Sequence, residues 1–149
     1  MNIKLAIKHE KEQIPTVGKL LRNLCSIANI ESELSVSQLE LAVVELLNNI
    51  INYSANLPSD SWITIHVRLT EASLAVVVSD RGDALGNELA KLYTDETVSM
   101  PTLDIGVADL PESGWGMQLI KSACDRISYR RSNQTNLYEL TFDLTSVAV

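Results

Sequence analysis

Residues 62–80 contain the pattern that most restricts what this chain can fold into. The segment WITIHVRL (62–69) alternates apolar and polar residues, TEAS makes a turn, and LAVVVSD (74–80) is almost continuously apolar. Alternation predicts a strand buried on one face, and a continuous apolar run predicts a strand in the centre of a sheet. We therefore predict an antiparallel hairpin whose second strand is central.

The other elements follow from their periodicities. Further strands are predicted at 2–9, 126–131 and 137–144, and helices at about 15–28, 36–54, 86–93 and directly after the GWG motif at 114–116. The chain contains no repeat and no interdomain linker. The sequence therefore predicts one α+β domain over residues 1–149, with about five mostly antiparallel strands and three or so helices on one face.

Composition restricts the possible functions. The 149 residues carry a net charge of −7, which argues against nucleic-acid binding through phosphate neutralisation and leaves a basic protein partner open. No apolar run approaches the roughly 20 residues that span a membrane, and the first residues lack the apolar stretch of a signal peptide. We therefore expect a cytoplasmic protein, in which Cys25 and Cys124 are reduced core residues.

The helix predicted at 36–54 has an unusual polar side. Five residues form it, with no lysine or arginine among them: Glu45, Asn48, Asn49, Asn52 and Tyr53. Asparagine is a poor helix former, so three asparagines within five positions favour a function over a solvated face, which is the alternative. Amide oxygens suit Mg²⁺ that also holds substrate phosphates, and a carboxylate one turn away can accept a proton from a nucleophile.

Two glycine-containing motifs follow. SDRGDAL places Asp80 where the buried strand emerges, so its carboxylate could accept a hydrogen bond from a ligand donor such as an adenine amino group; an ordinary β-turn is the alternative. In ESGWGMQLI, Gly114 and Gly116 precede the predicted helix, where backbone N–H groups could approach an anion, and a flexible hinge is the alternative. Neither motif is a P-loop or a Rossmann fingerprint.

In this order the motifs resemble the GHKL ATPase superfamily, which includes gyrase-type ATPases, histidine-kinase catalytic domains and bacterial anti-sigma-factor serine kinases. VVELLNNIINYS resembles the N box, SDRGDAL the first glycine box and ESGWGMQLI the second, and the resemblance extends over residues 3–144. The chain length and the segment AVVELLNNIINYSA resemble the anti-sigma-factor serine kinase branch. The resemblance implies a two-layer sandwich of the GHKL (Bergerat) type with a long ATP lid at about 84–113.

The resemblance also implies roles for individual residues. Asn49 would ligand the Mg²⁺ that bridges the ATP phosphates, and Glu45 would be the general base that faces a substrate serine. Asp80 would hold the adenine amino group, with Gly82 allowing close approach of the backbone. Independently of the resemblance, Thr141 in the last predicted strand is a candidate to support the Asp80 carboxylate through its hydroxyl or a water, with the strand register left open. The phosphate end and the lid hinge would be formed by Gly114, Trp115, Gly116 and Met117.

The function implied by the resemblance is that of an ATP-dependent serine kinase that is also an anti-sigma factor. Members of this branch bind a sigma factor or phosphorylate a small anti-anti-sigma protein of the STAS type, commonly as homodimers. ATP and Mg²⁺ are the implied cofactors, with no direct contact to nucleic acid or membrane.

The sequence departs from the family in two places. Tyr53 stands where the branch often has histidine, and a phenol can still donate a hydrogen bond. From Asp83 to Glu112 there are seven acidic side chains and one basic, Lys91, although phosphoryl transfer needs positive charge around the γ-phosphate. Some relatives have an arginine before the second glycine box, where this chain reads PES, so Arg81, Lys91 or a partner would have to supply the charge.

Two other functions compete with this interpretation. The acidic lid favours a module that binds nucleotide and sequesters its partner but transfers little phosphate. A histidine-kinase-like fragment is the third possibility, because His9 and Glu10 resemble a phosphoacceptor pair. No two-helix hairpin surrounds that pair, so His9 and His66 are better interpreted as surface or strand residues.

Overall fold

A computed structural model describes residues 1–53, 61–94 and 112–145 of the chain, with the side chains of 112–115 outside the description. Within these ranges the elements in chain order are β1 (Asn2–Lys8), η1 (Lys11–Gln13), α1 (Ile14–Ile27), α2 (Val36–Tyr53), β2 (Trp62–Leu69), β3 (Ser73–Asp80), α3 (Asn87–Thr94), α4 (Glu112–Ala123), β4 (Arg126–Ser132) and β5 (Thr135–Asp143). The predicted strands and helices are therefore present, with small shifts at their ends.

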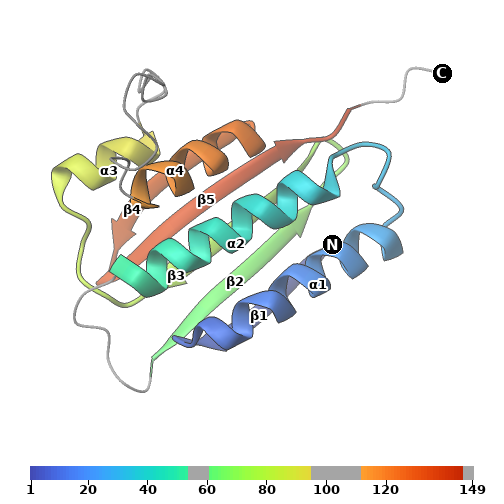
Figure 1. The fold of residues 1–149 in the computed structure, drawn as a ribbon. Helices are drawn as coiled ribbons and strands as arrows, with labels where there is room; N and C mark the ends of the chain where they lie inside the picture. The colour runs from blue at the N-terminus through green and yellow to red at the C-terminus, as the bar shows by residue number, and fades with distance from the viewer. Residues whose placement is uncertain (54–60, 95–111, 146–149) are drawn as a thin grey trace.

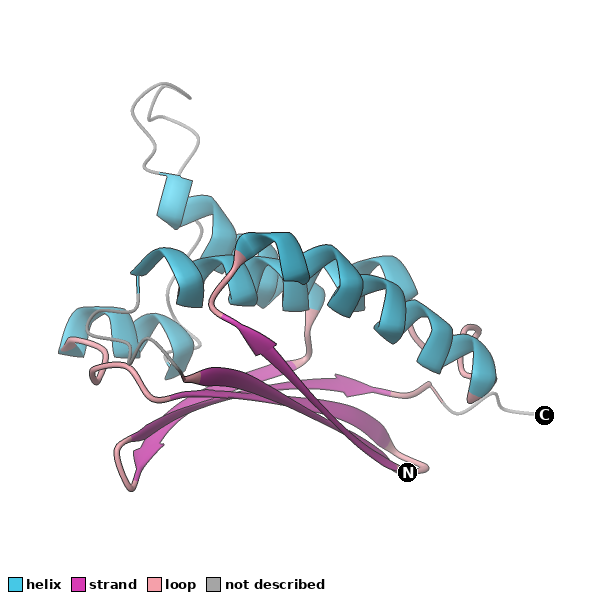
Figure 2. Ribbon diagram, turned by 90° about the horizontal axis from the view of Figure 1, so that it is seen from below, coloured by secondary structure: helices cyan, strands magenta, loops and turns pink. Residues whose placement is uncertain are grey.

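The five strands form one sheet in the order β1-β2-β3-β5-β4, and every neighbouring pair is antiparallel. The predicted hairpin of β2 and β3 is confirmed, and β3 lies at the centre of the sheet. Figure 2 shows the helices on one side of the sheet and the other side bare. The prediction of a two-layer α+β fold is confirmed.

Helix α2 crosses the middle of the sheet and supplies much of the core (Figure 1). Its N-terminus is capped by Ser35, whose Oγ accepts a hydrogen bond from the backbone N–H of Gln38 at 3.3 Å. The residues that it buries recur at helical spacing: Leu39, Ala42, Val43, Leu46, Leu47 and Ile50. This periodicity fixes the rotation of α2, so the polar side that begins at Glu45 cannot face the sheet.

A two-residue turn sets the register of the last two strands. Asn133 and Gln134 join β4 to β5 with φ values of 51° and 62°, and the flanking residues Ser132 and Thr135 are paired. Positive φ at both positions is the geometry of a type I′ hairpin turn, whose twist matches the strands. In this register Asn136 of β5 lies opposite Asp80 of β3.

No helix in the described ranges is long and apolar enough to cross a membrane. Cys25 is buried and Cys124 half-buried, and both are free thiols. Burial is the main reason that the pKa of Cys124 rises to about 11, with the negative charge of Asp125 adding to it. This thiol is therefore protonated and unreactive at neutral pH.

Candidate functional site

Asp80 ends the central strand β3 as a buried carboxylate, 1% exposed. Its Oδ1 accepts hydrogen bonds from the backbone N–H of Gly82 at 2.8 Å and from Nδ2 of Asn136 at 3.1 Å. Its Oδ2 is equally buried and has no partner among the described residues. A buried carboxylate oxygen without a donor is costly, so this atom is suited to receive a donor from a ligand.

Asn136 of β5, which is fully buried, holds this carboxylate and the loop after it. Its Nδ2 also donates to the carbonyl oxygens of Gly82 and Asp83, at 3.3 and 2.9 Å. Its Oδ1 accepts from the hydroxyl of Tyr129 at 2.6 Å and from Arg131 at 2.9 Å. One amide thus fixes both the side chain of Asp80 and the backbone of the first glycine motif.

Arg131 adds a second support to this loop, because its guanidinium donates to the carbonyl of Gly82 at 2.8 Å. Tyr129 adds a third, because its hydroxyl accepts from the backbone N–H of Leu85 at 3.1 Å. Asn136, Tyr129 and Arg131 were not predicted from the sequence. They could have been located only from the register of the β4–β5 hairpin. The turn that sets this register, Asn133–Gln134, contains no glycine that would mark it in the sequence.

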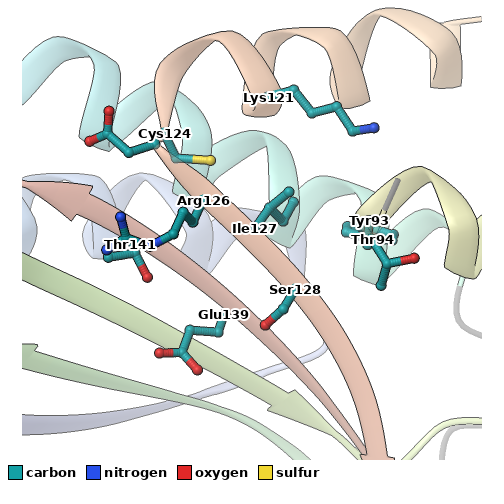
Figure 3. Close-up of a pocket in the computed structure, with 10 residues that line it drawn as sticks. Tyr93, Thr94, Lys121, Cys124, Arg126, Ile127, Ser128, Glu139 and Thr141 are labelled. Carbon is teal, nitrogen blue, oxygen red and sulfur yellow. The ribbon is translucent and has the colours of Figure 1, made fainter. Parts of the chain in front are cut away.

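The prediction that Thr141 supports Asp80 is wrong. Thr141 pairs with Ala75 of β3, five residues from Asp80, and with Arg126 of β4. Its parity along β5 is opposite to that of Asn136, so its side chain lies on the bare face of the sheet. Thr141 and Arg126 both line a cavity of about 500 Å³ (Figure 3). Neither Asp80 nor Glu45 lines that cavity.

Glu45 and Asn49 lie one turn apart on α2, and both are half-buried. They meet α4 at Gly116, where a Cβ atom would lie 3.1 Å from Oδ1 of Asn49 and 3.3 Å from Oε2 of Glu45. The structure therefore places the second glycine motif against Glu45 and Asn49. A side chain at position 116 would be too close to both of them. Tyr53, one helical turn after Asn49 on the same polar side, is 50% exposed.

Helix α4 begins earlier than the sequence predicts. We expected Gly114 and Gly116 to precede the helix, because glycine lowers helix stability by about 1 kcal/mol relative to alanine. The observed helix begins at Glu112 and includes both glycines and the backbone of Trp115. Contact between α4 and α2 explains the difference, since Gly116 allows a close approach that a larger residue would prevent. Met117, the last of the four residues predicted to form the phosphate end, is buried in the core.

Tyr93 of α3 joins the two halves of the site. The side chain of Asn49 lies near its hydroxyl and lowers its pKa, an effect smaller than the rise that burial causes. Burial raises the pKa of Tyr93 to about 12, and the nearby Asp80 carboxylate also raises it. One tyrosine therefore lies near both the acid of the first glycine motif and the amide of α2, which places these two regions on one side of the fold (Figure 1).

The predicted lid is described only in part. Its first portion contains α3, which is the short helix predicted near 86–93, whereas residues 95–111 lie outside the described residues. Arg81 and Lys91 are both exposed. His9 directly follows the last residue of β1 and is half-buried, with Nε2 3.1 Å from Oγ of Ser61, and His66 lies within β2. Both histidines are strand or strand-end residues, as predicted.

The arrangement fits a nucleotide with its metal ion. The unpartnered oxygen of Asp80 can accept a hydrogen bond from the amino group of a base. Oδ1 of Asn49 is a hard oxygen ligand of the kind that divalent cations bind. The described residues contain no group of three His, Cys, Asp or Glu side chains that could hold a metal alone. This suits Mg²⁺, which commonly takes one or two protein ligands and completes its shell with phosphate oxygens and water.

A two-layer fold with a buried acid at the end of its central strand, and a Glu–Asn pair against a glycine, is the arrangement expected of a GHKL-type ATPase. The sequence matches the family model of the histidine kinase-like ATPase domain over residues 7–142. The chain therefore belongs to the histidine kinase-like ATPase domain family. Membership of an ATPase family implies that it binds ATP. The comparison with curated proteins gave no match.

Two solved structures share the fold. The RsbU and RsbW domains of Rv1364c from Mycobacterium tuberculosis match with a TM-score of 0.63 at 13% identity, over 99% of this chain and 34% of that one. The mycobacterial sensor histidine kinase MprB matches with a TM-score of 0.52 at 13% identity, over 99% of this chain and 100% of that one. The chain thus spans about a third of the length of the first of these structures.

We expect Asp80→Asn to weaken ATP binding and to reduce the preference for ATP over GTP. The substitution places an NH₂ donor where the unpartnered Oδ2 of Asp80 is. An N–H would then face the N–H of the adenine amino group, and no hydrogen bond could form. Loss of a hydrogen bond to a charged group corresponds to roughly 10- to 100-fold in affinity. Calorimetric titration with both nucleotides measures the change. An unaltered ATP-to-GTP ratio would show that the base is read elsewhere.

Proposed function

We propose that this chain is an ATP-dependent serine kinase and an anti-sigma factor, which phosphorylates a STAS-type anti-anti-sigma protein and sequesters a sigma factor. The observation that carries the proposal is the convergence of Glu45 and Asn49 on Gly116. It joins a possible general base, a possible metal ligand and the second glycine motif in one place. The resemblance of the sequence to the anti-sigma-factor kinase branch, and the fold shared with an RsbW domain, support this choice of substrate and partner.

In this proposal Asn49 would hold Mg²⁺, which would offset the negative charge of the ATP phosphates, and Asp80 and Gly82 would bind the adenine. Gly114, Trp115, Gly116 and Met117 would form the phosphate end of the site and the hinge of the lid. Glu45 would accept the proton of the substrate serine as the serine oxygen forms its bond to the γ-phosphorus, while the bond from the γ-phosphorus to the β–γ bridging oxygen breaks and ADP leaves. The proton acceptor lies one helical turn from the metal ligand, so both act on the same phosphoryl group. We also propose a homodimer, as is common in the branch.

The first test of this proposal is Mg²⁺-dependent binding of ATP. We expect saturable binding that is tighter with Mg²⁺ than with EDTA, followed by tryptophan fluorescence and by calorimetry. Asn49→Ala should remove most of the Mg²⁺-dependent gain, on the order of tenfold, because it removes one ligand of the ion. Asn52→Ala is the matched control, since it deletes an exposed amide of the same helix. Equal Mg²⁺ dependence in wild type and Asn49→Ala would remove Asn49 from the metal site.

Transfer of phosphate to protein is the second test. Incubation with radiolabelled ATP and a STAS-domain protein from the same genome should label a serine of that protein. Binding of nucleotide and of partner without labelling would favour the alternative function, a nucleotide-binding module that sequesters its partner with little turnover. The observation in favour of this alternative is the run of seven acidic residues and one basic residue from Asp83 to Glu112.

A further inference from the structure

The face of the sheet opposite the helices is basic, although the chain is acidic (Figure 2). Successive residues of a strand point to opposite faces, so the residues between the core positions point to this bare face. The described strands place five basic and two acidic side chains there: Lys4, Lys8, Arg68, Arg126, Arg130, Glu139 and Asp143. The whole chain has 12 basic and 19 acidic residues, so the net charge of −7 conceals this face.

Both acidic side chains of the bare face are already paired. Arg126 holds the two carboxylate oxygens of Asp143 at 2.8 and 3.0 Å. Arg68 holds the carboxylate of Glu139 at 3.2 Å. These acids therefore offset two of the five positive charges and leave the other three.

The three remaining cations, Lys4, Lys8 and Arg130, are exposed and form no ion pair with any residue that the structure describes. The ammonium of Lys8 lies 5.6 Å from the centre of the Trp62 ring, which is itself 48% exposed on the same face. A surface with uncompensated charge of one sign attracts and orients a partner of the opposite sign. The bare face is therefore complementary in charge to an acidic surface.

A groove of about 170 Å³ lies on this face, with an arginine from each of two separated strands. Arg68 of β2 and Arg130 of β4 line it, and Val77 of β3 and Leu137 of β5 lie between them in the sheet. Guanidinium groups bind carboxylates with strong, directional hydrogen bonds, and arginine and tryptophan are the residue types that often dominate binding at protein interfaces. The groove therefore suits aspartate or glutamate side chains of another protein.

We propose that the bare face of the sheet is a docking surface for an acidic protein, whose aspartate and glutamate side chains bind Lys4, Arg68 and Arg130. A second copy that packed through the same face would set like charges against each other. Sheets that bind single-stranded nucleic acid stack bases on several aromatic side chains, whereas Trp62 is the one aromatic residue on this face of the described strands. An acidic protein surface meets neither objection.

This inference goes beyond the proposed function and does not depend on it. Glu45 and Asn49 belong to the helix layer, on the other side of the sheet from the docking surface (Figure 2). A partner bound to the bare face would therefore leave the nucleotide site uncovered.

The test is binding of a fluorescein-labelled oligoglutamate peptide to the full chain, followed by fluorescence anisotropy at low ionic strength. Lys4→Glu/Arg130→Glu is compared with Lys11→Glu/Lys19→Glu, which changes the net charge equally at exposed positions of η1 and α1. We expect the affinity to fall at least about tenfold in the first variant and less than about threefold in the second, because close like charges repel more strongly than distant ones. In NMR spectra the peptide should shift backbone amide signals of β1, β2 and β4 and leave those of α1 in place.

Several outcomes would overturn the inference. Wild type that does not bind the peptide at low ionic strength, or equal loss of affinity in the two variants, would show that this face does not recognise acidic side chains. Tighter binding of an oligouridylate of the same charge would make it a nucleic-acid surface. Self-association that sedimentation detects in wild type and not in Lys4→Glu/Arg130→Glu would make the occupant a second copy. ATP affinity of this variant, expected to match wild type, is measured separately, so failure of the nucleotide site would not affect the result.

Discussion

Glu45→Gln is expected to lower the rate of phosphotransfer by about 10²- to 10⁴-fold, the usual contribution of a positioned general base. The amide has the same shape as the carboxylate, so the contact with Gly116 and the neighbouring Asn49 is retained. It cannot accept the proton of a serine hydroxyl. ATP affinity should change by less than about threefold, because the base acts on the hydroxyl of the substrate and not on the nucleotide. Single-turnover labelling of a STAS-domain substrate and calorimetry with ATP give the two quantities.

Glu40→Gln is the control for this experiment. Glu40 also lies on α2, but it forms an ion pair with Arg22 of α1, away from Gly116. Neutralising it removes one negative charge from the same helix, so a general effect of charge would appear in both variants. We expect near wild-type transfer in Glu40→Gln. Parallel loss of ATP affinity and transfer in Glu45→Gln would contradict the role of a base and would place Glu45 in nucleotide binding.

Asn136→Ala is expected to lower the free energy of unfolding by about 2–4 kcal/mol and to abolish detectable ATP binding. Alanine removes all five hydrogen bonds of a fully buried amide. Oδ1 of Asp80 and the carbonyl of Gly82 would each lose one of their two donors, and the hydroxyl of Tyr129 would lose its acceptor. A buried polar group left unpaired costs about 1–3 kcal/mol, less what water recovers. Urea denaturation measures the stability, and calorimetry at a temperature where the variant is folded measures binding.

Thr141→Ala distinguishes the observed support of Asp80 from the one that the sequence predicted. Thr141 also lies on β5 and also loses a side-chain oxygen, but on the bare face of the sheet. We expect its stability to change by less than about 1 kcal/mol and its ATP affinity to match wild type. The reverse result, with Thr141→Ala impaired and Asn136→Ala close to wild type, would overturn the assignment of Asn136.

Much of the fold could be predicted because periodicity is a local property of the chain. The alternation in WITIHVRL and the apolar run LAVVVSD gave the hairpin and its central strand, and the apolar arc of α2 gave the helix that covers it. The same periodicity placed Glu45 and Asn49 on the side away from the sheet. The start of α4 could not be found in this way, because the local preference of glycine is outweighed by the contact that Gly116 makes with α2.

The hairpin, the sheet-facing arc of α2 and the three motifs can be read from the chain alone, since each depends on residues close together in the sequence. That Asn136 and not Thr141 holds Asp80 follows only from the fold, because it depends on a strand register set by the turn at Asn133 and Gln134. The position of Tyr93 near both Asn49 and Asp80 likewise follows only from the fold, because these residues come from three different elements. A side chain's partners across a fold follow from strand register and helix packing, which no local pattern specifies.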